Sequence, residues 1–222
     1  MKKVKKFFRE NSLTIVMLGL FVLFLVGLSI SGSSSYNEEQ KDHGEKTITY
    51  QEYLTTAHFQ EAIFENWESE FLQMWAFVIL TVFLRQKGSS DSKKLRGKED
   101  VDTYSKYSLL RSNTLRKKVR ALGHALYSHS LGLALLLLFI VSFVFHAISG
   151  TQVFNEEAIV HGSKTVTVVE YVQDPQFWFE SFQNWQSEFL AVGALTVLSI
   201  YLRERGSPES KPVGKSHKQT GK

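Results

Sequence analysis

Cysteine is absent from the 222 residues, so the chain has no disulfide, no thiolate nucleophile and no zinc site built on cysteine. The common catalytic and nucleotide-binding signatures are absent as well. There is no Walker loop, no Gly-x-Ser-x-Gly, no His-Glu-x-x-His and no dinucleotide fingerprint. No nucleophile, base and orienting group can be combined into a catalytic set. We therefore predict a protein that is not an enzyme and that needs no cofactor.

The chain contains an internal duplication. Residues 31–93 and 149–211 align without a gap at an offset of 118, and 28 of the 63 aligned positions are identical. The strongest block, Asn66–Leu72, returns as Asn184–Leu190. Identity at one fixed offset over this length indicates two tandem repeats of one structural unit.

Apolar runs and charge alternate along the chain. Residues 13–30 and 131–148 are runs of 18, long enough to span a membrane, whereas 71–84 and 189–202 are runs of 14, which is ambiguous. The segments around them, 1–12, 31–70, 85–129, 149–188 and 203–222, carry net charges of +4, −7, +8, −5 and +4. Basic flanks stay on the cytoplasmic side during insertion, so the alternation predicts four spans with both termini inside.

One alternative is a cleaved signal peptide, with residues 1–9 as its basic region and 29–35 as its cleavage site. The first apolar run is longer than the usual h-region of about 7–15 residues, and the run at 131–148 is internal, where cleavage makes no sense. We therefore expect an all-α polytopic membrane protein with four transmembrane helices. Both repeats enter from the inside and return to it, so they share one orientation about a pseudo-two-fold axis along the membrane normal.

The predicted organisation has four parts. Repeat 1 covers 1–86, with spans at 13–31 and 67–85 and an outer segment at 32–66. Repeat 2 covers 129–204, with spans at 130–149 and 185–203 and an outer segment at 150–184. A basic cytoplasmic linker at 87–128 holds an amphipathic helix at 114–127, and the cytoplasmic tail at 205–222 is expected to be disordered.

The charge of the linker indicates one expected partner, the lipid bilayer. Its basic charge suits the anionic inner leaflet of a bilayer, so nucleic acid is not needed to explain the pI near 9. A membrane protein partner or a second copy of the chain remains open.

Two glutamates are the sharpest candidates for function. Counting inward from Arg85 and Arg203 over about 20 helical residues places Glu70 and Glu188 inside the outer edge of the hydrocarbon. Each has an asparagine and a serine on the same helix face, so a paired polar cluster could bind a cation or relay a proton. The full candidate cluster is Asn66, Ser69, Glu70, Asn184, Ser187 and Glu188. The alternative is that both glutamates lie at the headgroup level and pair with the outer segments.

Other polar positions have simpler structural interpretations. Trp67, Trp185, Arg85 and Arg203 are expected to be interfacial anchors. His146, in the third span, has Leu28 at the equivalent position and is expected to be a packed or hydrogen-bonded core residue and not a proton relay. Glu39 with His43, and Glu157 with His161, have the i, i+4 spacing of a metal-ligand pair on a helix, but the glycine after each histidine suggests a turn. These four residues are weak candidates for a metal site.

Several blocks resemble a known family. Residues 36–39, 65–74 and 182–211, which include the Asn-Trp-x-Ser-Glu-Phe-Leu motif, are similar to a bacterial family of four-pass integral membrane proteins of unknown function with two internal repeats. The resemblance covers nearly the whole chain apart from the linker and tail. It implies a multi-pass protein of the bacterial inner membrane, and it implies no activity and no site residues.

The sequence leaves three functional hypotheses. The leading one is a non-enzymatic scaffold or interaction protein with an acidic and aromatic outer cap, for which changing Glu70 and Glu188 to Gln would leave partner binding intact. The second is a small proton or cation transporter or channel that uses the same two glutamates. The third, weaker hypothesis is a membrane metal-binding protein that uses the histidines at 43 and 161.

Overall fold

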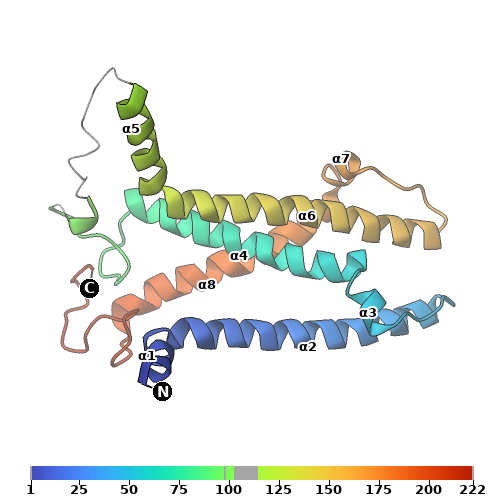
Figure 1. The fold of residues 1–222 in the computed structure, drawn as a ribbon, viewed down its shortest axis with the longest axis horizontal. Helices are drawn as coiled ribbons and strands as arrows, with labels where there is room; N and C mark the ends of the chain where they lie inside the picture. The colour runs from blue at the N-terminus through green and yellow to red at the C-terminus, as the bar shows by residue number, and fades with distance from the viewer. Residues whose placement is uncertain (1, 98, 103–114, 222) are drawn as a thin grey trace. The chain divides into compact units, whose positions relative to one another are not determined.

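The computed structural model describes residues 2–97, 99–102 and 115–221, with side chains described from residue 3 and, after the gap, from residue 122. All regular structure in these ranges is helical (Figure 1). The elements in chain order are α1 Lys2–Glu10, α2 Ser12–Asp42, α3 Tyr50–Tyr53, α4 Ala57–Phe83, the 3-10 turn η1 Asp100–Asp102, α5 Leu115–Ser128, α6 Ser130–Val160, α7 Val168–Tyr171 and α8 Pro175–Tyr201. The prediction of an all-helical protein is confirmed.

The helices of the two halves have equivalent bounds. Adding 118 to both ends of α2, α3 and α4 gives the ends of α6, α7 and α8. The offset of the sequence alignment is therefore also the offset of the helices.

The two long apolar runs form the longest helices. α2 and α6 have 31 residues each, and both are long and apolar enough to cross a membrane. They do not stop at residues 31 and 149, where the predicted spans end, but continue to Asp42 and Val160. The polar residues that follow each run include no proline, so nothing in them interrupts the helical hydrogen bonds.

Local sequence signals fix where the next helices begin. The Thr49 hydroxyl accepts from the Glu52 amide, and the Glu52 carboxylate accepts from the Thr49 amide at 2.7 Å, which forms a capping box at the start of α3. Asp174 caps α8 by accepting from the Gln176 amide at 2.8 Å, with Pro175 in the first helical turn. Both signals were readable in the sequence.

The chain divides into two compact units, one formed by residues 1–63 and 148–168 and the other by residues 64–147 and 169–222. In the first unit, two repeated asparagines hold the turns that follow the long helices. Asn37 accepts from the Ile48 amide at 2.8 Å and donates to the Ile48 carbonyl at 3.0 Å. Asn155 makes the same two bonds to Val166, at 2.7 and 2.9 Å. Each asparagine therefore holds the backbone segment that follows the turn against its own helix.

Replacing Asn37 by alanine is expected to release only one of the two turns. The loss of two hydrogen bonds should cost about 1–2 kcal/mol locally and speed exchange of the Ile48 amide by roughly tenfold. Hydrogen–deuterium exchange of the full chain measures this, and the Val166 amide is the internal control because Asn155 still holds it. The Asn155→Ala variant should give the reverse pattern. Equal protection of both amides in both variants would show that these asparagine side chains do not hold the turns.

The first unit also contains one close approach that only glycine permits. A Cβ on Gly32 would lie 2.2 Å from the Tyr53 hydroxyl oxygen, so a side chain at this position would displace the buried Tyr53 ring. That hydroxyl is 3.2 Å from His58 Nδ1. Gly32 therefore lets α3 lie directly against α2.

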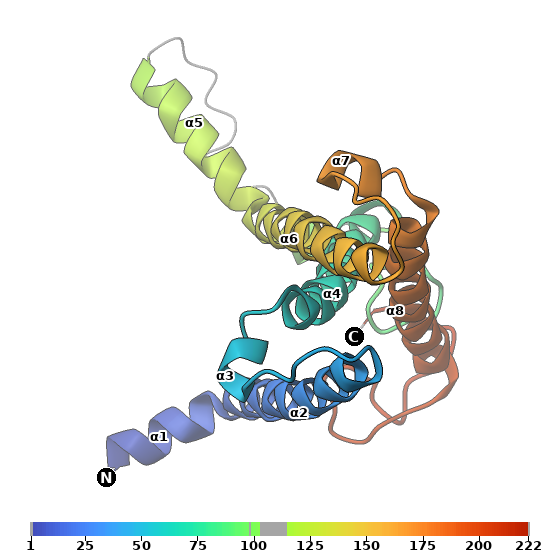
Figure 2. The same cartoon turned by 90° about the vertical axis from the view of Figure 1, so that its right-hand side faces the viewer.

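The second unit contains residues 64–83 of α4, residues 130–147 of α6 and all of α8 (Figure 2), and aromatic side chains of these helices pack against one another. Phe64 of α4 stacks on Phe145 of α6 with ring centroids 4.7 Å apart. Phe177 of α8 is fully buried and makes an edge contact with Phe143 of α6 at 5.4 Å. These ring contacts join the three helices at the end where α8 begins. At the other end α5 turns away from α6, in the place predicted for the amphipathic helix, although Thr114 lies outside the described residues.

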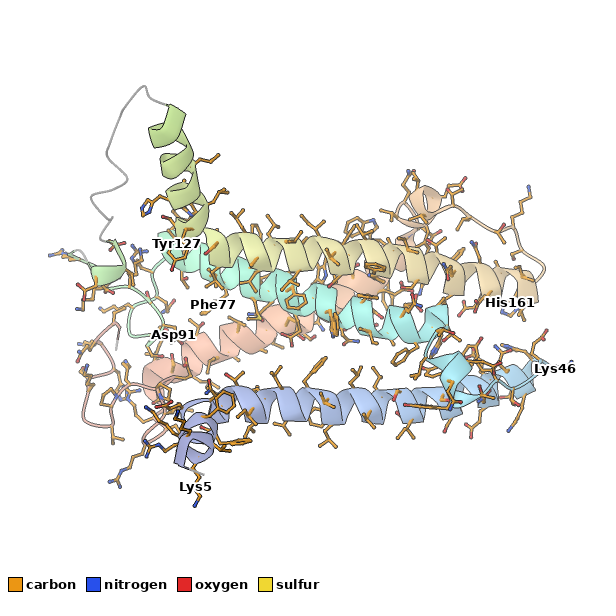
Figure 3. The ribbon with its side chains drawn as sticks, in the orientation of Figure 1. Lys5, Lys46, Phe77, Asp91, Tyr127 and His161 are labelled. Carbon is orange, nitrogen blue, oxygen red and sulfur yellow. The ribbon has the colours of Figure 1, made fainter. Side chains whose placement is uncertain are left out.

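The tail, for which the sequence predicts disorder, lies against the segment that follows α4 (Asp91 in Figure 3). The Lys211 ammonium group is buried and donates to the carbonyls of Gly88 and Gln219 at 2.5 and 3.1 Å. The Gly221 amide donates to the Ser89 carbonyl at 3.0 Å. Backbone carbonyls thus replace water around one lysine, an arrangement that tail composition does not reveal.

Candidate functional site

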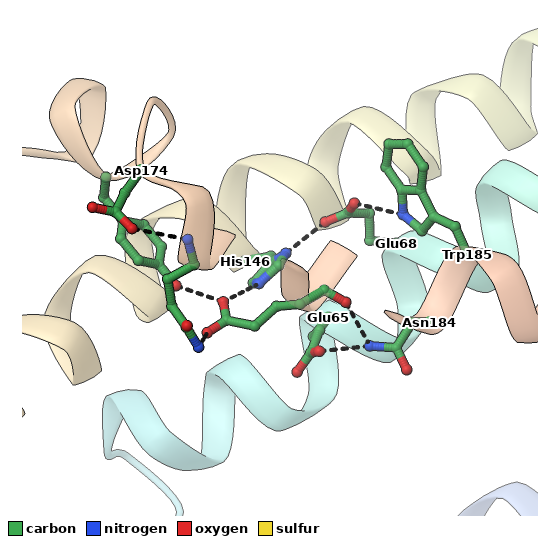
Figure 4. A network of polar contacts seen from close by, with 9 residues as sticks. Glu65, Glu68, His146, Asp174, Asn184 and Trp185 are labelled. Atoms are coloured by element: carbon green, nitrogen blue, oxygen red, sulfur yellow. Dashed lines mark hydrogen bonds and ion pairs between the residues drawn. The ribbon is translucent and has the colours of Figure 1, made fainter. Parts of the chain in front are cut away.

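The second unit contains a histidine–carboxylate pair with no access to solvent. His146 Nδ1 of α6 lies 2.6 Å from a carboxylate oxygen of Glu68 of α4, and both side chains are fully buried. The other ring nitrogen, Nε2, lies 3.7 Å from the carboxylate of Glu180 of α8. One imidazole therefore stands between two carboxylates from two different helices (Figure 4).

Further polar side chains surround the two carboxylates. The second oxygen of Glu68 accepts from the Trp185 indole at 2.9 Å. Glu180 accepts from the Tyr171 hydroxyl at 2.6 Å and from the side-chain amide of Gln176 at 2.7 Å. Asn184 donates to Glu65 at 2.5 Å and to the Glu180 backbone carbonyl at 3.3 Å. We call this set the buried network, after the three members that are buried, Glu68, His146 and Tyr171. Its other members are the half-buried Glu65, Glu180, Asn184 and Trp185 and the exposed Gln176.

The apolar frame of the buried network fixes the imidazole ring. His146 stacks on Phe177 with ring centroids 4.9 Å apart and an interplanar angle of 29°. Tyr171 makes an edge contact with Phe177 at 5.5 Å, which also sets the direction of its hydroxyl. The ring nitrogens of His146 are thus held toward the two carboxylates by packing as well as by charge.

Two half-buried carboxylates of the network, Glu180 of α8 and Glu65 of α4, have opposite pKa shifts. Burial alone would raise the pKa of Glu180, but the interaction with His146 and the hydrogen bonds from Tyr171 and Gln176 outweigh it and hold the pKa below its usual range. Burial raises the pKa of Glu65, and the nearby His146 only partly opposes this. The site therefore holds two acidic groups of unequal proton affinity beside one imidazole, which is an arrangement that can exchange a proton.

The predicted glutamates lie outside the buried network. Glu70 is exposed and Glu188 is half-buried, and their carboxylates are close enough to interact electrostatically. The hydroxyls of Ser69 and Ser187 do not join them, because each donates at 2.8 Å to the carbonyl three residues earlier in its own helix. Of the predicted cluster, Asn184 contributes to the buried network.

The predicted anchors have different environments. Trp67 is half-buried and packs edge-on against Phe64, with ring centroids 5.7 Å apart, whereas Trp185 bonds to Glu68. Arg85 and Arg203 follow the ends of α4 and α8, and each donates through Nη1 to carbonyls of its own last turn. The arginines thus cap the helix ends.

The weak metal candidates meet around one cavity in the first unit. Glu39, His43, Glu157 and His161 are exposed and line a cavity of about 240 Å³, with His58 at its wall. Burial lowers the pKa of His58, against the opposing charge of Glu39. Carboxylates and imidazoles are ligand types that could hold a cation there. α2 and α6 end one residue before each histidine, the amides of His43 and His161 still donate to the carbonyls of Glu39 and Glu157 at 3.1 and 3.0 Å, and Gly44 and Gly162 follow in the left-handed conformation.

The buried network uses positions at which the two copies differ. His146 corresponds to Leu28, Glu68 to Gln186 and Glu180 to Ala62. Residues that both copies share, such as Glu70 and Glu188, therefore do not indicate the buried network. The available signal was the opposite one: a histidine inside an apolar run with no counterpart, which the sequence correctly indicates to be a hydrogen-bonded core residue.

The fold and the buried network define an all-helical protein with two helices long and apolar enough to cross a membrane and a cluster of ionisable side chains inside one of its units. The chain belongs to the family described as a domain of unknown function, DUF6766, whose model matches residues 4–222. The expected membership of a family of unknown function is confirmed. No curated protein and no solved structure matches the chain.

Proposed function

We propose that the chain is a four-pass protein of the bacterial inner membrane, with both termini in the cytoplasm and two repeats in the same orientation. The alternation of segment charge supports this topology. α4 and α8 have 27 residues each and would be about 40 Å long, enough to cross a hydrocarbon core of about 30 Å together with α2 and α6. The basic linker would then lie against the anionic inner leaflet.

The function that the geometry supports best is proton transport across the membrane. The observation that carries it is His146, buried between Glu68 and Glu180, with one ring nitrogen facing each carboxylate. An imidazole so placed can take a proton on one nitrogen and release one from the other. Ionisable side chains inside a membrane are costly and are usually part of an ion or proton pathway.

The route into this site is defined by exposure. The side chain of Glu180 is 21% exposed, whereas those of His146 and Glu68 are fully buried. A proton would therefore arrive at Glu180 near the start of α8, pass to His146 and reach Glu68. In the proposed topology the start of α8 faces the outside of the cell, so uptake would occur from that side.

Proton flux in proteoliposomes tests this proposal. With a pH-sensitive dye inside the vesicles, the Glu68→Gln and Glu180→Gln variants should each reduce flux by about tenfold or more, because each removes a group that exchanges the proton. The second copy has glutamine, Gln186, at the position equivalent to Glu68, which makes glutamine a conservative replacement.

The matched control is the double variant Glu70→Gln, Glu188→Gln, in which two glutamates change outside the buried network. It should keep at least half of the flux. If this variant abolishes flux while the other two do not, the polar pair predicted from the sequence is the pathway. If the wild-type protein gives no flux at any pH, proton transport is excluded and the scaffold hypothesis gains support, with a partner protein or second copy as its binding target.

A further inference from the structure

A second feature lies at the other end of α4, away from the buried network. A cavity of about 260 Å³ is lined on one side by Phe77, Leu80 and Leu84, and at its polar side by Arg85, Ser89 and Asp91. Phe77 and Arg85 are eight residues apart, which corresponds to about 12 Å along a helix. Figure 3 labels Phe77 and Asp91, two residues of this lining. The volume is below the range of about 300–1,000 Å³ typical for whole small molecules, so the cavity suits one end of a longer amphipathic molecule.

The equivalent arginine of the second copy shows what Arg85 needs. Arg203 uses Nη1 for its own helix end, as Arg85 does, and its Nη2 donates to the Lys215 carbonyl and contacts His217 Nδ1, both at 3.3 Å. In the part of the chain that the structure describes, the hydrogen bonds of Arg85 come from Nη1 alone. The tail thus supplies acceptors to Arg203, and the cavity beside Arg85 has room for acceptors from a ligand.

The charges around the cavity narrow the choice of ligand. The guanidinium of Arg85 binds phosphate oxygens well, because its donors match their geometry. Asp91 on the same lining disfavours a ligand with net negative charge and favours an ammonium group. A phosphate and an ammonium group on one headgroup, followed by an acyl chain against Phe77 and Leu80, satisfy the whole lining.

We propose that this cavity binds a zwitterionic phospholipid with a primary amine, a phosphatidylethanolamine, with its phosphate on Arg85 and its amine toward Asp91. The inference rests on the proposed four-pass topology, in which the end of α4 lies at the inner boundary of the membrane. It does not depend on proton transport. Soluble phosphoethanolamine lacks the acyl chain and should therefore bind much more weakly than the lipid.

Native mass spectrometry of the full chain in detergent measures the retained lipid. After delipidation, phosphatidylethanolamine should be retained about tenfold better than phosphatidylglycerol at equal concentration, and phosphoethanolamine at that concentration should not displace it. Arg85→Gln should reduce retention by about tenfold. Asp91→Asn should shift the preference toward phosphatidylglycerol, because it removes the charge that repels an anionic headgroup.

Arg203→Gln is the matched control, since it changes the equivalent arginine outside the cavity and should leave lipid retention unchanged. Helix content by circular dichroism shows that each variant is folded. Equal retention of both lipids, or an Arg85→Gln variant that is folded and retains the lipid, would overturn the lipid site. Release of the protein from membranes by alkaline carbonate would instead overturn the four-pass topology, and absence of proton flux would overturn only the transport function.

Discussion

Replacing His146 by leucine is expected to lower the free energy of unfolding by about 3–5 kcal/mol. Leucine is the residue at the equivalent position of the first copy, Leu28, so a helix of this type accommodates its shape. The cost comes from Glu68, whose carboxylate is fully buried and would lose the ring nitrogen that lies 2.6 Å away. Only the Trp185 indole would then remain among the bonds described for that carboxylate.

A second change should recover most of this loss. In the double variant His146→Leu, Glu68→Gln, the buried group is neutral and its side-chain oxygen can still accept from Trp185. More than half of the lost stability should therefore return, because an unpaired buried charge costs far more than an unpaired amide. Unfolding of the purified protein in detergent, followed by tryptophan fluorescence, measures both variants. A single variant as stable as the wild type, or a double variant that is no better than the single one, would show that the pair is not a buried charge pair.

Replacing Phe177 by alanine is expected to cost about 3–5 kcal/mol, the usual range for removal of a large aromatic side chain from a packed interior. Phe177 is fully buried and contacts the rings of Phe143, His146, Tyr171 and Trp178. Its loss would leave a cavity beside the imidazole and remove the surface against which that ring stacks. The same unfolding measurement applies.

The control for this prediction lies two residues further along the same helix. Phe179 is 64% exposed, so Phe179→Ala should change the stability by no more than about 0.5 kcal/mol. The pair tests burial with helix, residue type and substitution held constant. If the two variants have equal stability, Phe177 does not occupy a packed core.

The residues that the two copies share and the residues of the buried network are different sets. Both copies keep Glu70 and Glu188, and these side chains lie at exposed or half-buried positions. The network instead needs one histidine and the carboxylates around it, and it is built once per chain from positions where the copies diverged. Identity between repeats indicates what each copy needs to form its helices. Divergence indicates what is particular to one place in the assembled unit.

Asn37 and Asn155 show the first kind of position. Both copies keep them, and each holds the turn after its long helix by the same two bonds. Capping signals such as those of Thr49 and Asp174 can be read from the sequence, because their partners lie two or three positions away. The bonds of Asn37 and Asn155 reach residues 11 positions further along the chain, so the structure was needed to find them.

The sequence by itself determined the helical class, the apolar character of α2 and α6, and the starts of α3 and α8. These depend on periodicity, composition and contacts within one turn. Only the tertiary structure decided that His146 meets Glu68, 78 residues away, and that Lys211 of the tail bonds to Gly88. Burial of a charge depends on which helix faces cover it, and those faces come from segments far apart in the chain. A pattern along one helix gives the face on which Glu68 lies, but packing alone supplies the imidazole opposite it.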